Sequence, residues 1–166
     1  MSVLIEQIVE AEIAARLRTE LHPVVVDILP DKEREPRYPN GAVLVAYQSS
    51  SFGAVRSFDD LVAQEEELVF DVTLLSRSLR DRTGIYPLMR AAKSALLGFR
   101  PSHCGQLILK DSRFVDRDDM VWVWSLSFST TTLTVATMPD ETLPTLTRLT
   151  LKDNLDNTEV IPDENL

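Results

Sequence analysis

The stretch that most constrains the fold lies at residues 81–99, where the sequence favours the one strong helix of the second half of the chain. Pro87 falls in the first turn of this helix, where its missing N–H costs little. Gly98 provides a stop, because glycine is common just past the end of a helix. Leu88, Ala92 and Leu96 recur on one side and form an apolar stripe. The pattern predicts a helix at residues 85–97 that buries this stripe.

The segments on both sides of this helix have the pattern of β-strands. Residues 68–76 alternate between two faces, residues 120–134 also have a β-strand pattern, and shorter runs typical of strands occur at 24–29, 42–47 and 106–109. We expect the run at 42–47 to be a central strand. An amphipathic helix, which Ser2 can cap, should end near Leu21. Together these elements predict an α+β fold, in which a mostly antiparallel sheet carries the N-terminal helix and the 85–97 helix on one face.

The last predicted strand carries four large side chains on a single face, alternating with valine and serine on the other. Aromatic side chains of this size bury much apolar area, so this face should dominate the core where it meets the helix. The expected core residues are Leu88, Ala92, Leu96, Trp122, Trp124, Leu126 and Phe128.

Three polar stretches predict connections between these elements. Residues 30–40 carry three prolines, residues 49–63 are expected to form a long hairpin connection, and residues 111–119 a charged turn. Apolar side chains in an exposed loop often mark an interface. We therefore expect four side chains of the second stretch to contact another subunit or a partner: Phe52, Val55, Arg56 and Phe58.

The 166 residues are enough for one domain with a sizeable core, which we place at residues 1–135. The remaining residues 136–166 are rich in proline and acidic side chains, and they predict an extended segment. Such a segment either contacts a neighbouring subunit or frays in solvent, as chain termini often do.

The net charge of −9 disfavours a general DNA-binding protein or a membrane-surface protein, because phosphate groups attract basic surfaces. We expect no membrane partner and no sequence-specific nucleic-acid binding. Cys104 is the only cysteine, which excludes a disulfide within the chain and fits a reducing compartment. The first residues are acidic and lack the form of a signal peptide, which predicts synthesis and assembly in a cytoplasm.

A search of the sequence for chemistry is mostly negative. It contains no glycine-rich phosphate loop, nucleophile elbow or paired metal-binding histidines. His22 and His103 are expected to be surface residues, and the aspartates at 116, 118 and 119 lack the glycine and glutamate of a calcium loop. We expect no catalytic residue, metal or cofactor.

Three arginines, Arg77, Arg80 and Arg82, precede the helix. Such a cluster can bind phosphate. On a chain this acidic, pairing with carboxylates of the same or a neighbouring subunit is the favoured interpretation.

The order of the predicted elements resembles that of phage tail terminator proteins, both the Mu-type tail-completion proteins and the minor tail protein U of long-tailed phages. Three short patches carry the resemblance: AVLV at 42–45, IYPLM at 85–89 and the tryptophan-rich strand at 122–128. The resemblance covers residues 2–134.

What the resemblance implies is an assembly protein of the virion, at the tail or neck, that is put together in the host cytoplasm. In that family an α/β subunit forms a hexameric ring, which caps the finished tail tube and stops its polymerisation. The implied partners are further copies of the chain, the tail tube protein, a neck or head–tail connector protein and, in contractile tails, a sheath protein. No active site is implied.

Two other classes of function stay open from the sequence. A monomeric binding module of another complex would need no ring. A nuclease could use carboxylates such as Glu67 and Asp71 at a sheet edge, although no matching lysine motif follows them.

Overall fold

The computed structural model describes residues 4–30, 41–58, 61–118 and 120–136. These residues contain two helices and five strands. Contacts within the chain group residues 1–136 into one unit. Nearly all of the acidic segment 136–166 and of the connection predicted at 30–40 lies outside the described residues. The elements are α1 (Ile5–Glu20), β1 (Val25–Ile28), β2 (Ala42–Phe58), β3 (Leu61–Ser76), α2 (Ile85–Leu96), β4 (Ile108–Asp118) and β5 (Val121–Val135).

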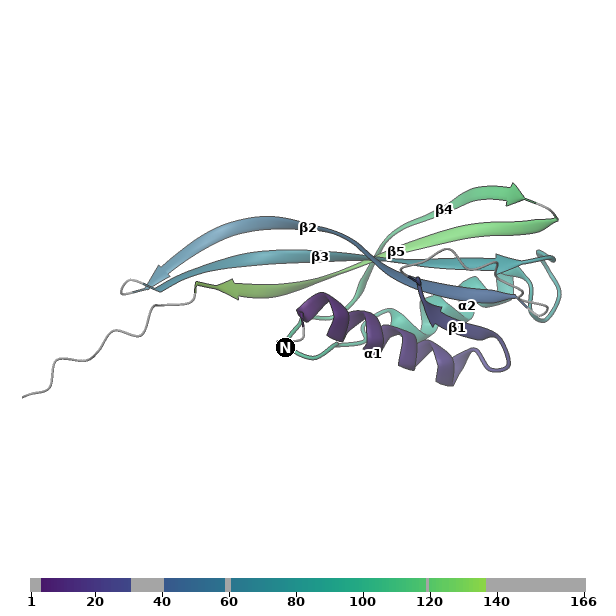
Figure 1. Ribbon diagram of the computed structural model, residues 1–166, viewed down its shortest axis with the longest axis horizontal. Helices are drawn as coiled ribbons and strands as arrows, with labels where there is room; N and C mark the ends of the chain where they lie inside the picture. Colours follow the sequence, from purple (N-terminus) through teal and green to yellow (C-terminus); the bar gives the residue numbers. More distant parts are fainter. Residues whose placement is uncertain (1–3, 31–40, 59–60, 119, 137–166) are drawn as a thin grey trace, which may run out of the picture. The chain divides into compact units, whose positions relative to one another are not determined.

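The strands form one sheet in the order β1-β2-β3-β5-β4 (Figure 1). The pairs β2–β3, β3–β5 and β4–β5 are antiparallel, and only the short β1 pairs in parallel, with residues 42–45 of β2. The predicted α+β class and the mostly antiparallel sheet are confirmed. The strand that begins at Ala42 lies inside the sheet, between β1 and β3, whereas the central position belongs to β3.

The core lies between one face of the sheet and the two helices. Along β3 the even-numbered residues from 66 to 76 are buried, and the odd-numbered residues between them are only partly buried. Phe70 and Leu74 lie on the buried face with Leu126 and Phe128 of β5, which stand opposite residues 72 and 70. Helix α1 adds Val9, Ile13 and Leu17, and α2 adds Leu88, Ala92 and Leu96.

Helix α2 begins after Gly84 and ends at Leu96, close to the predicted bounds. Gly98 has φ +81°, a left-handed conformation that glycine adopts at little cost, and its N–H donates to Leu107 O at 2.9 Å. The helix therefore stops where the chain turns back toward the sheet. The residue that precedes α1 is Leu4, which makes no side-chain cap, and the expected cap residue Ser2 lies outside the described residues.

Two predicted connections prove to be strands. Residues 49–63 were expected to connect two strands, but β2 continues to Phe58 and β3 begins at Leu61. The charged turn expected at 111–119 is also wrong, because β4 runs to Asp118. Both segments lie where the sheet is open to solvent, so serine and charged side chains occupy strand positions that a buried strand would fill with apolar ones.

Trp122 and Trp124 are the core residues whose predicted position needs correction. They share a face with Leu126 and Phe128, as expected, but they are only partly buried. Phe114 of the edge strand β4 packs beside both indole rings, with centroids 6.0 and 5.9 Å away. The tryptophans therefore border the core.

Neither described helix has the length and apolar character that crossing a membrane requires.

Candidate interaction surfaces

The described part of β2, β3 and β5 continues beyond the helix-covered half of the sheet as a three-stranded ribbon (Figure 1). We call this ribbon the β arm, and define it as residues 52–57 of β2, 61–65 of β3 and 133–135 of β5. Among the described residues, neither helix packs over it. All six arm residues of β2 are exposed, in contrast to the buried Val43 and Val45 of the same strand.

Apolar side chains occupy both faces of the β arm. Phe52 stands opposite Glu66, and Val55 opposite Gln64, so both point to the face that the helices cover elsewhere. Their exposed fractions are 59% and 60%. The opposite face carries Leu133 and Val135, which are also exposed. Exposed apolar surface that is contiguous often marks an interaction site, which makes the β arm a candidate.

The edges of the β arm are open as well. Strand β1 pairs only with residues 42–45 of β2, and β4 pairs only with residues 121–129 of β5. Within the described ranges, residues 52–57 and 133–135 therefore lack a strand partner on their outer sides. An open edge of a sheet is a template for another strand, which natural proteins usually cover or block.

A buried carboxylate fixes the base of the β arm. Glu66 is 7% exposed and accepts hydrogen bonds from Ser50 Oγ, at 2.6 Å, and from Thr134 Oγ1. Tyr47 OH and Ser50 Oγ share a further hydrogen bond of 2.7 Å. These hydrogen bonds connect β2, β3 and β5 where the helix-covered core ends. They stabilise the part of the sheet from which the β arm extends.

The predicted interface residues of the 49–63 stretch all fall on the β arm or at its end. Phe52 and Val55 lie on one face, and Arg56, opposite Ala63, lies on the other. Phe58 is the last residue of β2, and its side chain lies outside the described part. Val62, Leu133 and Val135 are additional exposed apolar residues that were not among the predicted interface residues, although Val62 lies in the same 49–63 stretch.

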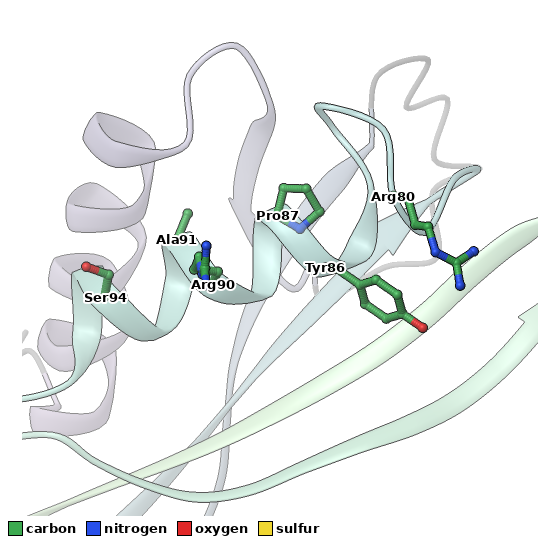
Figure 2. Close-up of a pocket in the computed structure, with 6 residues that line it drawn as sticks. All are labelled: Arg80, Tyr86, Pro87, Arg90, Ala91 and Ser94. Atoms are coloured by element: carbon green, nitrogen blue, oxygen red, sulfur yellow. The ribbon is translucent and has the colours of Figure 1, made fainter.

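A second surface is an open groove along the outer side of α2 (Figure 2). We call it the arginine groove. In Figure 2, Arg80 extends from the loop before α2 and lies beside Tyr86, at the start of the helix. The Arg80 guanidinium carbon lies 5.7 Å from the Tyr86 ring centroid, within cation–π range. The groove is lined by Arg80, Tyr86, Pro87, Arg90, Ala91 and Ser94.

Hydrogen bonds from backbone N–H groups hold the loop that carries Arg80. Ser78 Oγ accepts from the N–H groups of Arg80 and Asp81, at 3.3 and 3.1 Å. The Tyr86 N–H donates to Leu79 O at 2.9 Å, and the Gly84 N–H to Asp81 O at 2.7 Å. This compact turn sets Arg80 against the first turn of α2.

The three arginines predicted as an interaction site, Arg77, Arg80 and Arg82, are all exposed. Only Arg80 lines the groove, where it is joined by Arg90, which sequence reasoning missed. Helical spacing alone places residues 86, 87, 90, 91 and 94 on neighbouring turns, and it could have pointed to Arg90. No ion pair involves these arginines in the part of the chain that the structure describes.

A third surface is formed by the β4–β5 hairpin. The Arg117 guanidinium carbon lies 4.8 Å from the Trp122 ring centroid, and Trp124 Nε1 donates to Ser112 Oγ at 3.2 Å. Phe114 and Met120 are exposed, with Met120 at 73%. This cluster was not predicted, because Phe114 lies within a run of charged residues in the sequence.

The sheet face without helices carries two ion pairs between β3 and β4. Glu67 lies 2.9 Å from Lys110 Nζ, and this contact is the main cause of a pKa below the ordinary value for the Glu67 carboxyl. Asp71 lies 3.8 Å from Arg113 and accepts a hydrogen bond from Ser127. The two carboxylates that a nuclease hypothesis would use are therefore each paired with a cation of β4.

Among the described residues, no group of three His, Cys, Asp or Glu side chains is placed to hold a metal ion. Cys104 is partly buried, and its burial raises the pKa of the thiol. His22 and His103 are exposed, and the His103 carbonyl accepts a hydrogen bond from Thr132 Oγ1. The aspartates at 116 and 118 belong to β4, and residue 119 lies outside the described set.

The sequence and the structure were compared with known protein families, curated proteins and solved structures. A chain of the solved structure described as "Virion of native gene transfer agent (GTA) particle" aligns with a TM-score of 0.47 and 15% identity, over 78% of this chain and 98% of that one. No curated protein matches the sequence. The Gp37 protein family matches residues 13–153, which is most of the chain. The chain therefore belongs to the Gp37 protein family.

Proposed function

We propose that this chain is a structural assembly protein of a phage tail, which forms a hexameric ring, caps the tail tube and stops its polymerisation. The observation that carries this proposal is the β arm, with exposed apolar side chains on two faces and open edges. A subunit with such an arm needs a partner to cover it. The resemblance to tail terminator proteins supplies the kind of assembly in which that partner is another copy.

The mechanism follows from ring geometry. In a closed ring each subunit uses two different surfaces, one that reaches forward and one that receives the neighbour. We assign the forward surface to the β arm, with Phe52 and Val55 as its main apolar contacts. One side of the ring then meets the last ring of tail tube protein. The other side differs from it, so the tube stops growing and a neck or connector protein binds instead.

The chemistry of the described residues fits an assembly role. Glu67 and Asp71 are engaged by Lys110 and Arg113, and such pairs brace a sheet. Large apolar side chains are exposed on the β arm and on the β4–β5 hairpin. These are surfaces that bind proteins. A sheath protein is a further candidate partner if the tail is contractile.

Tube growth tests the proposal directly. Purified tail tube protein polymerised alone should give long tubes, and adding the full chain at the start should give shorter tubes with a cap of extra density at one end in electron micrographs. A variant with Phe52→Asp and Val55→Asp should fail to shorten the tubes. A matched control, Leu97→Asp, changes an exposed apolar residue outside the β arm and should act like the unmodified chain.

Tubes of unchanged length in the presence of the unmodified chain would contradict a role in tube termination. If the chain remains monomeric and still binds another tail component, the alternative of a monomeric binding module would replace the ring. Metal-dependent cleavage of DNA that Glu67→Ala abolishes would replace both with a nuclease.

A further inference from the structure

We propose that the arginine groove of one subunit binds the acidic C-terminal segment, residues 137–166, of a neighbouring copy of this chain. The inference rests on the ring proposed above and names a contact within it. It brings together two features that the proposed contacts of the β arm do not use: a cationic groove and a stretch of acidic sequence.

The cationic side of this contact is Arg80 and Arg90. Both are exposed, both line the groove, and neither forms an ion pair with a carboxylate of the described ranges. Arg80 is also oriented in advance, because the turn before α2 and the Tyr86 ring hold it in place. An arginine that is already positioned loses less entropy when it binds a carboxylate.

The groove also offers apolar surface. Tyr86 is 45% exposed although it lies in the first turn of α2, and Pro87 and Ala91 lie beside it. A segment that suits this groove therefore alternates carboxylates with apolar side chains. Free phosphate or nucleic acid would match the arginines but leave this apolar surface uncovered.

Residues 137–166 have this composition. They contain seven Asp and Glu against two Lys and Arg, a net charge of −5 out of −9 for the whole chain. Leucine, valine and isoleucine recur between the acidic residues. Opposite charge on two surfaces favours their encounter and the correct orientation.

The position of this segment in the sequence suits a contact between copies. It follows directly after β5, whose last residues form part of the β arm. In the proposed ring the β arm lies on the neighbouring subunit, so the segment begins on the neighbour's surface. Thirty residues at up to about 3.3 Å each can span as much as about 100 Å, far more than one subunit requires.

The test uses the full chain carrying Arg90→Lys, which keeps the positive charge of the groove and introduces an amine. Equal amounts of protein grown with the light and the heavy nitrogen isotope are mixed, dissociated, reassembled and treated with a reagent that condenses carboxylates with amines at zero length. Mass spectrometry should find links from position 90 to carboxylates of 137–166, and the linked peptides should include pairs of mixed isotope. Adding Arg80→Glu should lower their yield several-fold.

The matched control is Arg100→Lys, which introduces an amine at an exposed position that does not line the groove. Equal linking from positions 90 and 100 would overturn the inference, as would links found only within one isotope. Light scattering on the same samples separates the two proposals. Rings without links at position 90 contradict this contact alone, whereas the absence of any ring contradicts the proposed function and this contact with it.

Discussion

The backbone N–H of Tyr47 donates a hydrogen bond to Glu10 Oε1 of helix α1, at 2.7 Å. This contact lies just past Val45, the last residue of β2 that pairs with β1. It satisfies a donor on an open strand edge with a helix side chain. Glu10 therefore binds β2 at the point where its pairing with β1 ends. The strand beyond this point is exposed and leads to the β arm.

Replacing Glu10 with alanine should lower the free energy of unfolding by about 1 kcal/mol, because the edge N–H loses its acceptor while water partly replaces it. Glu10→Gln keeps an oxygen at this position and should cost less. Urea denaturation followed by circular dichroism measures both. An equal loss of stability in the two variants would show that the charge, and not the hydrogen bond, matters here.

Leu96→Asp should prevent folding, because it places an unpaired carboxylate at a position that is 0% exposed. The expected cost exceeds about 4 kcal/mol, a large part of the stability of a typical domain. Ala92→Asp should behave in the same way, since that side chain is also fully buried. Circular dichroism and thermal unfolding of the purified variants measure the effect. A soluble, folded Leu96→Asp protein would mean that the core is misplaced.

Gly84→Ala should destabilise the turn that presents Arg80. A methyl group at this position would lie 2.7 Å from the carbonyl carbon of Leu79 and 2.8 Å from the Arg80 nitrogen, so the backbone must shift. We expect a loss of roughly 1–3 kcal/mol. Gly53→Ala is the matched control, because its nearest neighbour would be 3.6 Å away, an ordinary contact. Thermal unfolding should show little change for the control, and similar losses for both variants would contradict this account.

The Glu67–Lys110 ion pair predicts a pH dependence of stability. The hydrogen bond from Lys110 holds the pKa of the Glu67 carboxyl below its ordinary value. Folding therefore gains stability above the unfolded pKa, about 4.3, and loses this gain as the pH falls through the lower folded pKa. Glu67→Gln should remove the part of the pH dependence that comes from this carboxyl, a change in the free energy of unfolding of less than about 1 kcal/mol for an exposed pair. Urea denaturation from about pH 6 down to about pH 3 measures it, and an unchanged profile in the variant would count against the pairing.

The sequence predicted the elements whose periodicity comes from burial. The alternation around Phe70 in β3 and the stripe of Leu88, Ala92 and Leu96 in α2 each reflect a single buried face. Helix α2 was found at nearly the expected residues, and β3 contains the predicted strand at 68–76 but begins earlier, at Leu61. Residues 49–58 and 111–118 carry no such signal, because solvent-exposed strands accept serine and charged side chains. Their hydrogen bonds come from neighbouring strands distant in sequence, which a local pattern does not show.

The candidate surfaces were predicted only in part, because a local sequence pattern does not show which distant segments meet. Phe52 and Val55 stood out as apolar residues among polar ones, and the structure places them on the exposed arm. The open edges of that arm depend on where β1 and β4 stop pairing, which is a property of the whole sheet. The groove required the meeting of Arg80 from a loop with Arg90 from a helix, and only the fold brings these two residues together.

The central claim is that the β arm assembles this chain into a ring, and the mass of the particle in solution tests it most directly. Light scattering with negative-stain imaging should show a hexameric ring for the full chain. The variant with Phe52→Asp and Val55→Asp should be a folded monomer, with the circular dichroism spectrum of the unmodified chain. A full chain that remains monomeric at high concentration, or arm variants that still form rings, would contradict the account.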